Sequence, residues 1–164
     1  MPRHAALVPL SHDHHHALLL ALRLKKSGPV SKHDVWPTGL LAHAKATVEM
    51  IQRELYPHFM LEEQILFPEA RSIPNANILI DQLLAEHAKM RNGKGEILAL
   101  ADKSATEELS IKLVEFGTLL EQHIRREERE LFPVLEASFS SEIWASLKLR
   151  IDQAGPAFRA ACAI

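Results

Sequence analysis

The chain has 164 residues, a formal net charge of −2 and a single cysteine, Cys162. This length fits one domain over residues 1–164, and the charge leaves no excess of basic side chains to neutralise phosphates, which excludes nucleic acid and membrane surfaces as expected partners. One cysteine allows neither an intramolecular disulfide nor a cysteine-based zinc or iron–sulfur site.

The first predicted helix runs from Ser11, a plausible N-cap, to about Lys26, and Gly28-Pro29 ends it. Its leucine-rich run, Leu18–Leu22, is too short to cross a bilayer, and no small-residue cleavage site follows it. We therefore expect neither a signal peptide nor a membrane span, and a cytoplasmic location.

The second predicted helix runs from about Pro37 to Leu66, because apolar residues recur at helical spacing and Pro68 follows. Pro57 interrupts it and should kink it, since a proline removes one backbone hydrogen bond.

Three more helices are predicted from the same spacing. They run from just after Asn75 to about Ala101, from about Thr106 to Phe132 with a stop at Pro133 or soon after, and from about Ser141 to Ala154. The last is short and should pack across the others. No stretch alternates with period two over a strand's length, so the predicted fold class is all-α.

The chain contains ten histidines, and two of them begin a repeated motif. The pattern His-x-x-x-Glu-Glu-x-x-Leu-Phe-Pro starts at His58 and again at His123, each time near the end of a predicted helix. A spacing of four places the histidine and the first glutamate one turn apart on one helical face, where both side chains can reach one ion.

The first glutamates of the two motifs, Glu62 and Glu127, fall at the middle of apolar stripes on the helical wheel. Val134 belongs to the stripe around Glu127, whereas Glu63 and Glu128 project about a quarter turn away. A buried carboxylate without a partner costs on the order of several kcal/mol, so it has a raised pKa, an ion-pair partner or a metal. No lysine or arginine occupies these stripes, which favours a metal.

The first and third predicted helices each contribute a histidine preceded by an acidic residue. On the first helix His14 lies at the centre of the apolar stripe, and His15, near its border, is the alternative. On the third helix the histidine is His87. A single His-x-x-x-Glu pair is usually a surface feature, but two copies together with these histidines indicate a site. The inward set is then His14 or His15, His58, Glu62, His87, His123 and Glu127.

The types of ligand indicate which metal the set would hold. Nitrogen and carboxylate oxygen without thiolate suit iron, manganese or zinc, and glutamates that can bridge favour two ions over one. Six candidates exceed the four ligands of a structural zinc site, so we expect iron.

These motifs make the chain similar to the hemerythrin-like, or HHE cation-binding, domain family. The resemblance covers roughly residues 7–136 and rests on Asp-His in the first helix, Glu-His in the third, and the two His-x-x-x-Glu-Glu motifs with Leu-Phe-Pro. It implies an up-down-up-down four-helix bundle around two iron ions. The glutamates and an oxo or hydroxo group would bridge the ions, and one coordination position would stay open.

The chain also departs from the oxygen-carrying members of that family. They have a second histidine one turn after that of the third helix, where this chain has Arg91. They place the fourth-helix carboxylate five residues after its histidine, where Glu128 stands, whereas the helical wheel favours Glu127. The missing histidine argues against reversible oxygen carriage.

The sequence leaves three functions in competition. The favoured one is a protein that binds, senses or handles oxygen, nitric oxide, peroxide or iron itself. The second is a di-iron oxidase or peroxidase-like enzyme, although such bundles carry Glu-x-x-His, which is absent from this sequence. The third is a metal-free interaction bundle whose buried polar groups bond to one another.

Overall fold

The computed structural model describes residues 3–163, and every regular element in that range is helical. The elements in chain order are α1 (Val8–Lys25), α2 (Leu40–Met50), η1 (Ile51–Leu55), α3 (Tyr56–Leu61), η2 (Glu62–Leu66), α4 (Phe67–Ala70), η3 (Pro74–Ala76), α5 (Asn77–Asp102), α6 (Thr106–Arg126), η4 (Glu127–Leu131), α7 (Phe132–Ser138) and α8 (Ser141–Cys162). The prediction of an all-α fold is confirmed. None of the helices in this range is both long and apolar enough to cross a membrane.

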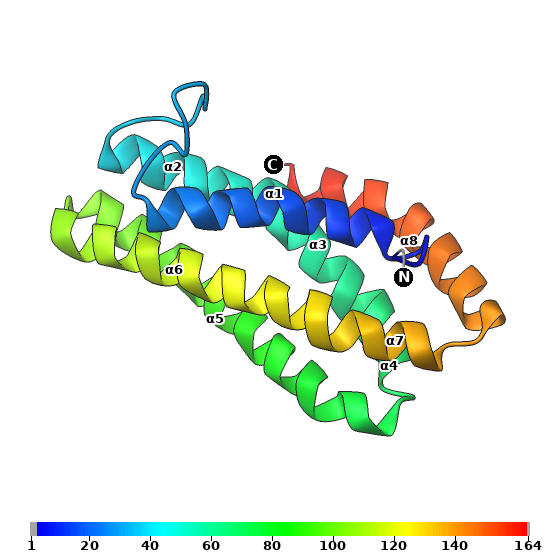
Figure 1. Cartoon of the computed structure of the whole chain (residues 1–164). Helices are drawn as coiled ribbons and strands as arrows, with labels where there is room; N and C mark the ends of the chain where they lie inside the picture. The colour runs from blue at the N-terminus through cyan, green and yellow to red at the C-terminus, as the bar shows by residue number, and fades with distance from the viewer. Residues whose placement is uncertain (1–2, 164) are drawn as a thin grey trace.

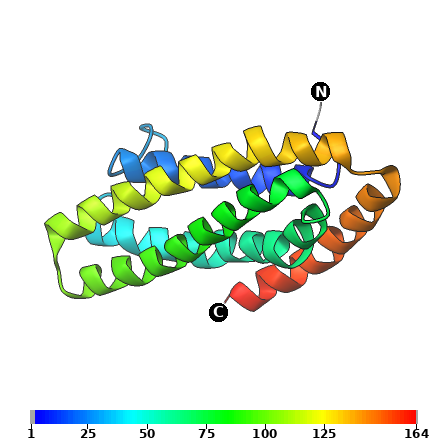
Figure 2. The same ribbon diagram turned by 90° about the horizontal axis from the view of Figure 1, so that it is seen from below.

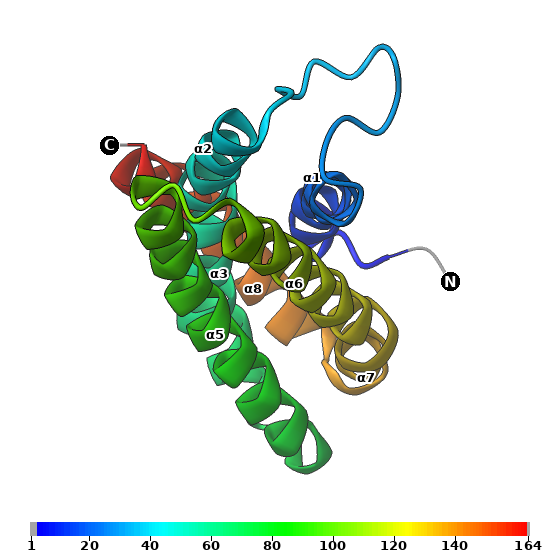
Figure 3. The same ribbon diagram turned by 90° about the vertical axis from the view of Figure 1, so that its left-hand side faces the viewer.

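Long helical rods lie alongside one another and give the molecule an elongated shape (Figures 1 and 2). The helix α1 packs on α6, α6 on α5, and α5 on α2. The connection between α1 and α2 is a long loop that stands out from the body at one end (Figure 3). The last helix, α8, packs along α3 (Figure 1).

Pro57, Pro68 and Pro133 each lie inside a long rod, which continues through them by means of a wider turn. The π-helical segments η1, η2 and η4 come directly before Tyr56-Pro57, Phe67-Pro68 and Phe132-Pro133. In each, the residue before the proline donates its N–H to the carbonyl five residues back. The proline ring would clash with the carbonyl four residues back in a regular α-helix, and the π turn removes that clash.

The π turns explain why two of the predicted helix ends are wrong. Pro57 interrupts the regular α-helix as predicted, but Pro68 and Pro133 do not end their helices, which continue to Ala70 and Ser138. Each π turn also inserts one residue and rotates the residues after it. Val134, predicted in the apolar stripe, is therefore 36% exposed, while residues 131 and 135 are fully buried leucines.

Three other predicted boundaries are also wrong. The first helix begins at Val8 with Pro9 in its first turn, where a missing N–H costs nothing, so Ser11 is inside the helix. The second begins at Leu40, because Gly39, at φ +94°, still belongs to the loop. The last reaches Cys162 through an exposed proline, beside which water can satisfy the freed carbonyl.

The core consists of two apolar clusters separated by a polar layer. Along α1, Leu10 belongs to one cluster and Ala17 to the other, and His14 lies between them. Along α5, Leu83 and Met90 belong to the two clusters, and His87 lies between them. The same order is repeated in the rods of α3 and α6, so each rod places its buried histidine at the same level.

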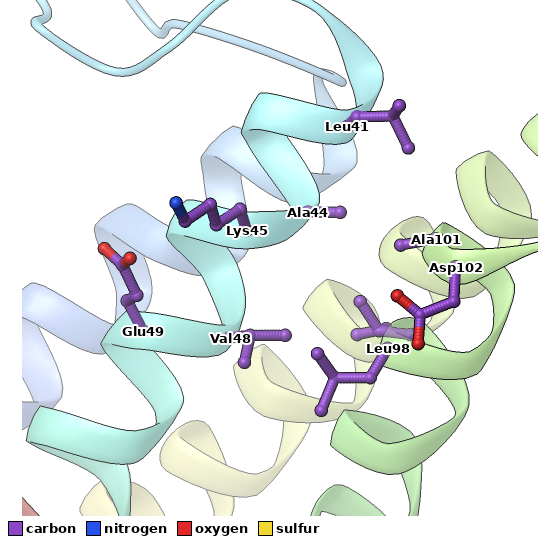
Figure 4. A pocket seen from close by; sticks show the side chains of 9 residues that line it. Leu41, Ala44, Lys45, Val48, Glu49, Leu98, Ala101 and Asp102 are labelled. Atoms are coloured by element: carbon purple, nitrogen blue, oxygen red, sulfur yellow. The ribbon is translucent and has the colours of Figure 1, made fainter. Parts of the chain in front are cut away.

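One end of the bundle is less tightly closed. An apolar groove of about 500 Å³ separates α2 from α5, with Leu41, Val48 and Leu98 on its walls (Figure 4). Leu41 is about half exposed there. Charged side chains, among them Lys45 and Asp102, line the rim.

Candidate metal centre

The polar layer brings together six of the seven predicted site residues. The buried ones are His14, His58, Glu62, His87, His123 and Glu127, and none is more than 3% exposed. Their ligand atoms form two groups that share both glutamates. His15 lies exposed on the outside of α1 and belongs to neither group.

The first group is built around His14 and His58, whose rings meet edge to face with their Nε2 atoms 3.1 Å apart. Glu62 Oε1 lies 3.2 Å from His58 Nε2 and 3.9 Å from His14 Nε2. Glu127 Oε2 lies 3.1 Å from His14 Nε2. Two imidazole nitrogens and one oxygen of each glutamate therefore converge on one point.

The second group repeats this arrangement around His87 and His123, whose Nε2 atoms lie 3.0 Å apart. The other oxygen of each glutamate serves it: Glu62 Oε2 lies 3.3 Å from His87 Nε2, and Glu127 Oε1 lies 3.4 Å from His123 Nε2. Each carboxylate thus directs one oxygen to each pair of histidines.

All four oxygens of Glu62 and Glu127 are buried and lack a hydrogen-bond partner. Histidine Nε2 atoms lie 3.1–3.4 Å from them, but none of these contacts has the geometry of a hydrogen bond. A buried carboxylate without a donor is costly, so two side by side require a compensating positive charge. This donor set, with nitrogen and oxygen atoms in two convergent groups, fits a pair of bound cations.

A second set of carboxylates holds the outer nitrogen of each ring. Glu128 lies 2.7 Å from His14 Nδ1 and Asp13 lies 3.4 Å from His58 Nδ1. Glu63 lies 2.7 Å from His87 Nδ1 and Glu86 lies 2.9 Å from His123 Nδ1. We call these four the outer carboxylates. Such a contact fixes the orientation of a metal-binding histidine and raises the basicity of its other nitrogen.

The outer carboxylates also set the histidine tautomers. An ionised carboxylate only accepts hydrogen bonds, so each Nδ1 must donate its N–H to it. A neutral ring then has a bare lone pair at Nε2. Two such lone pairs about 3 Å apart, next to unpaired carboxylate oxygens, repel one another until a cation or protons lie between them.

The pKa shifts without metal reflect the same charges. Burial by itself would lower the pKa of His58, but the charge of Glu62 and the contact with Asp13 raise it well above its usual value. Burial opposes the rise at His14 and His87 too, and the neighbouring glutamates overcome it. Burial would raise the pKa of Glu62, but His58 and His87 hold it well below its usual range. In the absence of metal, protons on these imidazoles replace part of the missing positive charge.

Arginines neutralise the outer carboxylates but not Glu62 and Glu127, the two inner glutamates. Arg3 lies 2.5 Å from Glu128, and Arg91 lies 2.8 Å from Glu63. Among residues 3–163, no lysine or arginine forms an ion pair with either inner glutamate. Although burial opposes it, His14, Ser11 and Arg3 lower the pKa of Glu128 to about 2.

Arg126 pairs with Glu86, and Arg159 lies 4.0 Å from Asp13. All four outer carboxylates therefore have a guanidinium nearby. The uncompensated negative charge is confined to Glu62 and Glu127.

The Leu-Phe-Pro ending of each motif also shapes this layer. The π segments η2 and η4 begin at the inner glutamates themselves, and the phenylalanines that follow pack on the histidines. Phe67 stacks on His87 and Phe132 on His14, with ring centroids 5.8 and 5.5 Å apart. Phe59 also stacks on His87, with ring centroids 3.9 Å apart. These aromatic walls keep water out of the layer.

The outer carboxylates were not predicted from the sequence, although a signal for them was present. Both motifs contain a doubled glutamate, and its second member binds the histidine of a neighbouring helix. Both acid-histidine pairs likewise supply an acid to a histidine on another helix. The contacts therefore occur in two equivalent pairs, one for each repeat of the motif.

The sequence matches the family model described as hemerythrin HHE cation binding domain over residues 5–135. The chain belongs to the hemerythrin HHE family. No individual curated protein matches the chain. The family binds metal cations, and this chain has a buried cluster of histidines and glutamates able to hold a metal.

Arg91 occupies the position where oxygen-carrying hemerythrins have a further histidine. In this hemerythrin domain its guanidinium pairs with Glu63 and lies over the Phe59 ring, 5.5 Å from its centre. It therefore supports His87 through Glu63, and each histidine pair keeps two imidazoles.

Proposed function

We propose that this protein holds two non-haem iron ions within an up-down-up-down four-helix bundle. With them it binds or senses a small ligand such as dioxygen, nitric oxide or peroxide, or handles iron itself. Manganese or zinc would suit the same types of ligand, but zinc has no redox chemistry, and iron suits dioxygen and nitric oxide as well as peroxide.

The observation that carries the proposal is the way Glu62 and Glu127 divide their oxygens. Each directs one oxygen to the His14–His58 pair and the other to the His87–His123 pair, and no oxygen accepts a hydrogen bond. A carboxylate that serves only one cation has no need to lie between two histidine pairs. This arrangement supports two bridged ions.

The number of ligands supports an open site. Each histidine pair offers two imidazole nitrogens and shares two carboxylates, a donor set of the kind that leaves positions free on non-haem iron. When bound, the iron ions supply redox-active positions to which a small ligand can coordinate. The chain holds the imidazoles in the required tautomer, excludes water, and limits access to small molecules through the burial of all six side chains.

The test is absorption between the near ultraviolet and the visible after reconstitution of the metal-free chain with ferrous iron and air. We expect charge-transfer bands that disappear in His58→Ala and in Glu62→Ala. Glu49→Ala, which removes an exposed carboxylate from the same rod, should keep them. Addition of nitric oxide or peroxide should then shift the bands.

Other outcomes would favour the alternatives. Steady turnover of peroxide or of an added reductant would indicate a di-iron redox enzyme. A colourless protein whose stability does not change with iron would indicate a metal-free interaction bundle and would contradict the proposal.

A further inference from the structure

The histidines next to His14 in the sequence are left without a role by the buried centre. His12 and His16 are both exposed, and they lie one turn apart on the same face of α1. Two histidines with this spacing on a helix can chelate one metal ion.

A third donor comes from the neighbouring rod. Glu54, in η1, has its Oε2 atom 3.6 Å from His16 Nδ1. Both side chains are about half exposed, so packing does not prevent them from rotating toward one shared ion. Two imidazoles and a carboxylate from two rods form the ligand set that many proteins use for zinc and related ions.

These three residues line one groove of about 570 Å³ between α1, η1 and α8. The charged and histidine side chains of that groove are His12, Asp13, His16, Arg53, Glu54 and Arg159. When the histidines are neutral, the positive charges of the two arginines equal the negative charges of the two acidic side chains. Binding there therefore depends on coordination by imidazole and not on a surplus of negative charge.

We propose that His12, His16 and Glu54 form a second, surface site for one transition-metal cation. It takes ions that prefer imidazole, such as Ni²⁺, Zn²⁺ and Fe²⁺, and it does not take Mg²⁺ or Ca²⁺, which prefer oxygen ligands. This part of the inference is independent of the buried centre.

The position of the surface site also gives it a role, which rests on the proposed function. Asp13 lines the same groove and contacts His58 of the buried layer. A cation captured by His12 and His16 is therefore one side chain away from the first histidine pair. The surface site serves as the entry point for iron.

Calorimetric titration with Ni²⁺ tests the surface site. The full chain should bind one more ion than either His12→Ala or His16→Ala, and Mg²⁺ should produce no heat. His15→Ala removes an exposed histidine that does not line the groove, and it should bind as many ions as the full chain. Equal numbers of ions in all four proteins, or binding of inorganic phosphate in place of Ni²⁺, would overturn the surface site.

A Glu62→Gln chain separates the two proposals. It should lose the ions of the buried centre and keep the ion that depends on His12 and His16. If Glu62→Gln loses nothing while His16→Ala still loses one ion, the proposed function fails and the surface site stands.

The rate of Fe²⁺ uptake by metal-free protein tests the entry role. His12→Ala and His16→Ala should load more slowly than His15→Ala and should reach the same final content of buried iron. Equal loading rates in the three variants would overturn the entry role.

Discussion

The two histidine pairs of the centre have nearly the same inner geometry, but their outer support differs. The Nε2 atoms are 3.1 Å apart in the His14–His58 pair and 3.0 Å apart in the His87–His123 pair. His87 and His123 are held by outer carboxylates at 2.7 and 2.9 Å. His14 is held as closely, at 2.7 Å, but the outer carboxylate of His58 is 3.4 Å away.

The difference lies in the side chain that supports His58. The other three outer carboxylates are glutamates with an arginine in close contact, whereas Asp13 is one methylene shorter and its arginine is 4.0 Å away. Asp13 also lines an open groove. His58 is therefore the least restrained of the four ligands, and the ion on its side should be the more easily exchanged.

The largest effect is expected from Glu62→Gln, because this side chain serves both histidine pairs. The amide has one oxygen and no charge, so neither pair keeps its full donor set. Metal analysis should show loss of both ions, while Glu49→Gln keeps them. Loss of only one ion would mean that the carboxylate does not bridge.

Removing the ions should make stability depend on pH. In the metal-free chain the pKa values of His14, His58 and His87 are raised despite burial, because the neighbouring glutamates favour their charged forms. A folded-state pKa above the unfolded value gives stability that is present below about pH 6.5 and is lost as pH rises through the folded value.

Thermal unfolding with and without a chelator should therefore show a difference in melting temperature that widens as pH rises above about 6.5 and through the raised folded-state pKa values. The loaded protein, with its imidazoles bound to metal, should show no such loss over that range. A constant difference would show that protons do not replace the metal.

Glu63→Gln should weaken metal binding by about 10–100-fold, the usual cost of losing the partner of a metal-binding histidine. This variant loosens His87 in the tightly held pair and removes the anion that pairs with Arg91. Competition with a chelator of known affinity would measure the loss. Glu49→Gln, on the exposed side of α2, is again the control.

Asp13→Asn should have the smallest effect, because the contact that it weakens is already long. We expect a loss below that of Glu63→Gln, measured in the same competition assay. A loss as large as that of Glu63→Gln would show that the two histidine pairs are equally restrained.

Much of the fold could be predicted from the sequence because the helices are amphipathic and their histidine–glutamate spacing is regular. The helical wheel of a regular α-helix correctly placed Glu62 and Glu127 inward. For Glu127 the wheel was valid because no π turn precedes this residue within its own helix. The helical wheel was wrong for residues after Glu127, because the π turn rotated Val134 outward.

Other features depend on local geometry or on contacts between helices that helical spacing does not reveal. The prolines at 68 and 133 were expected to stop their helices, but the π turns before them let the chain continue as a helix. Ser11 resembled an N-cap but instead donates its hydroxyl to Glu128. The doubled glutamates and the acid-histidine pairs were a signal for the outer carboxylates, but assigning each one to a histidine required knowing which helix faces which.

The most direct test of the metal centre is the iron content of the protein purified without added metal. Two buried carboxylates that lack any donor predict two ions per chain, both removed by a strong chelator with a drop in melting temperature. A chain that contains no transition metal and melts at the same temperature with or without iron would contradict the claim that a pair of cations lies between Glu62 and Glu127.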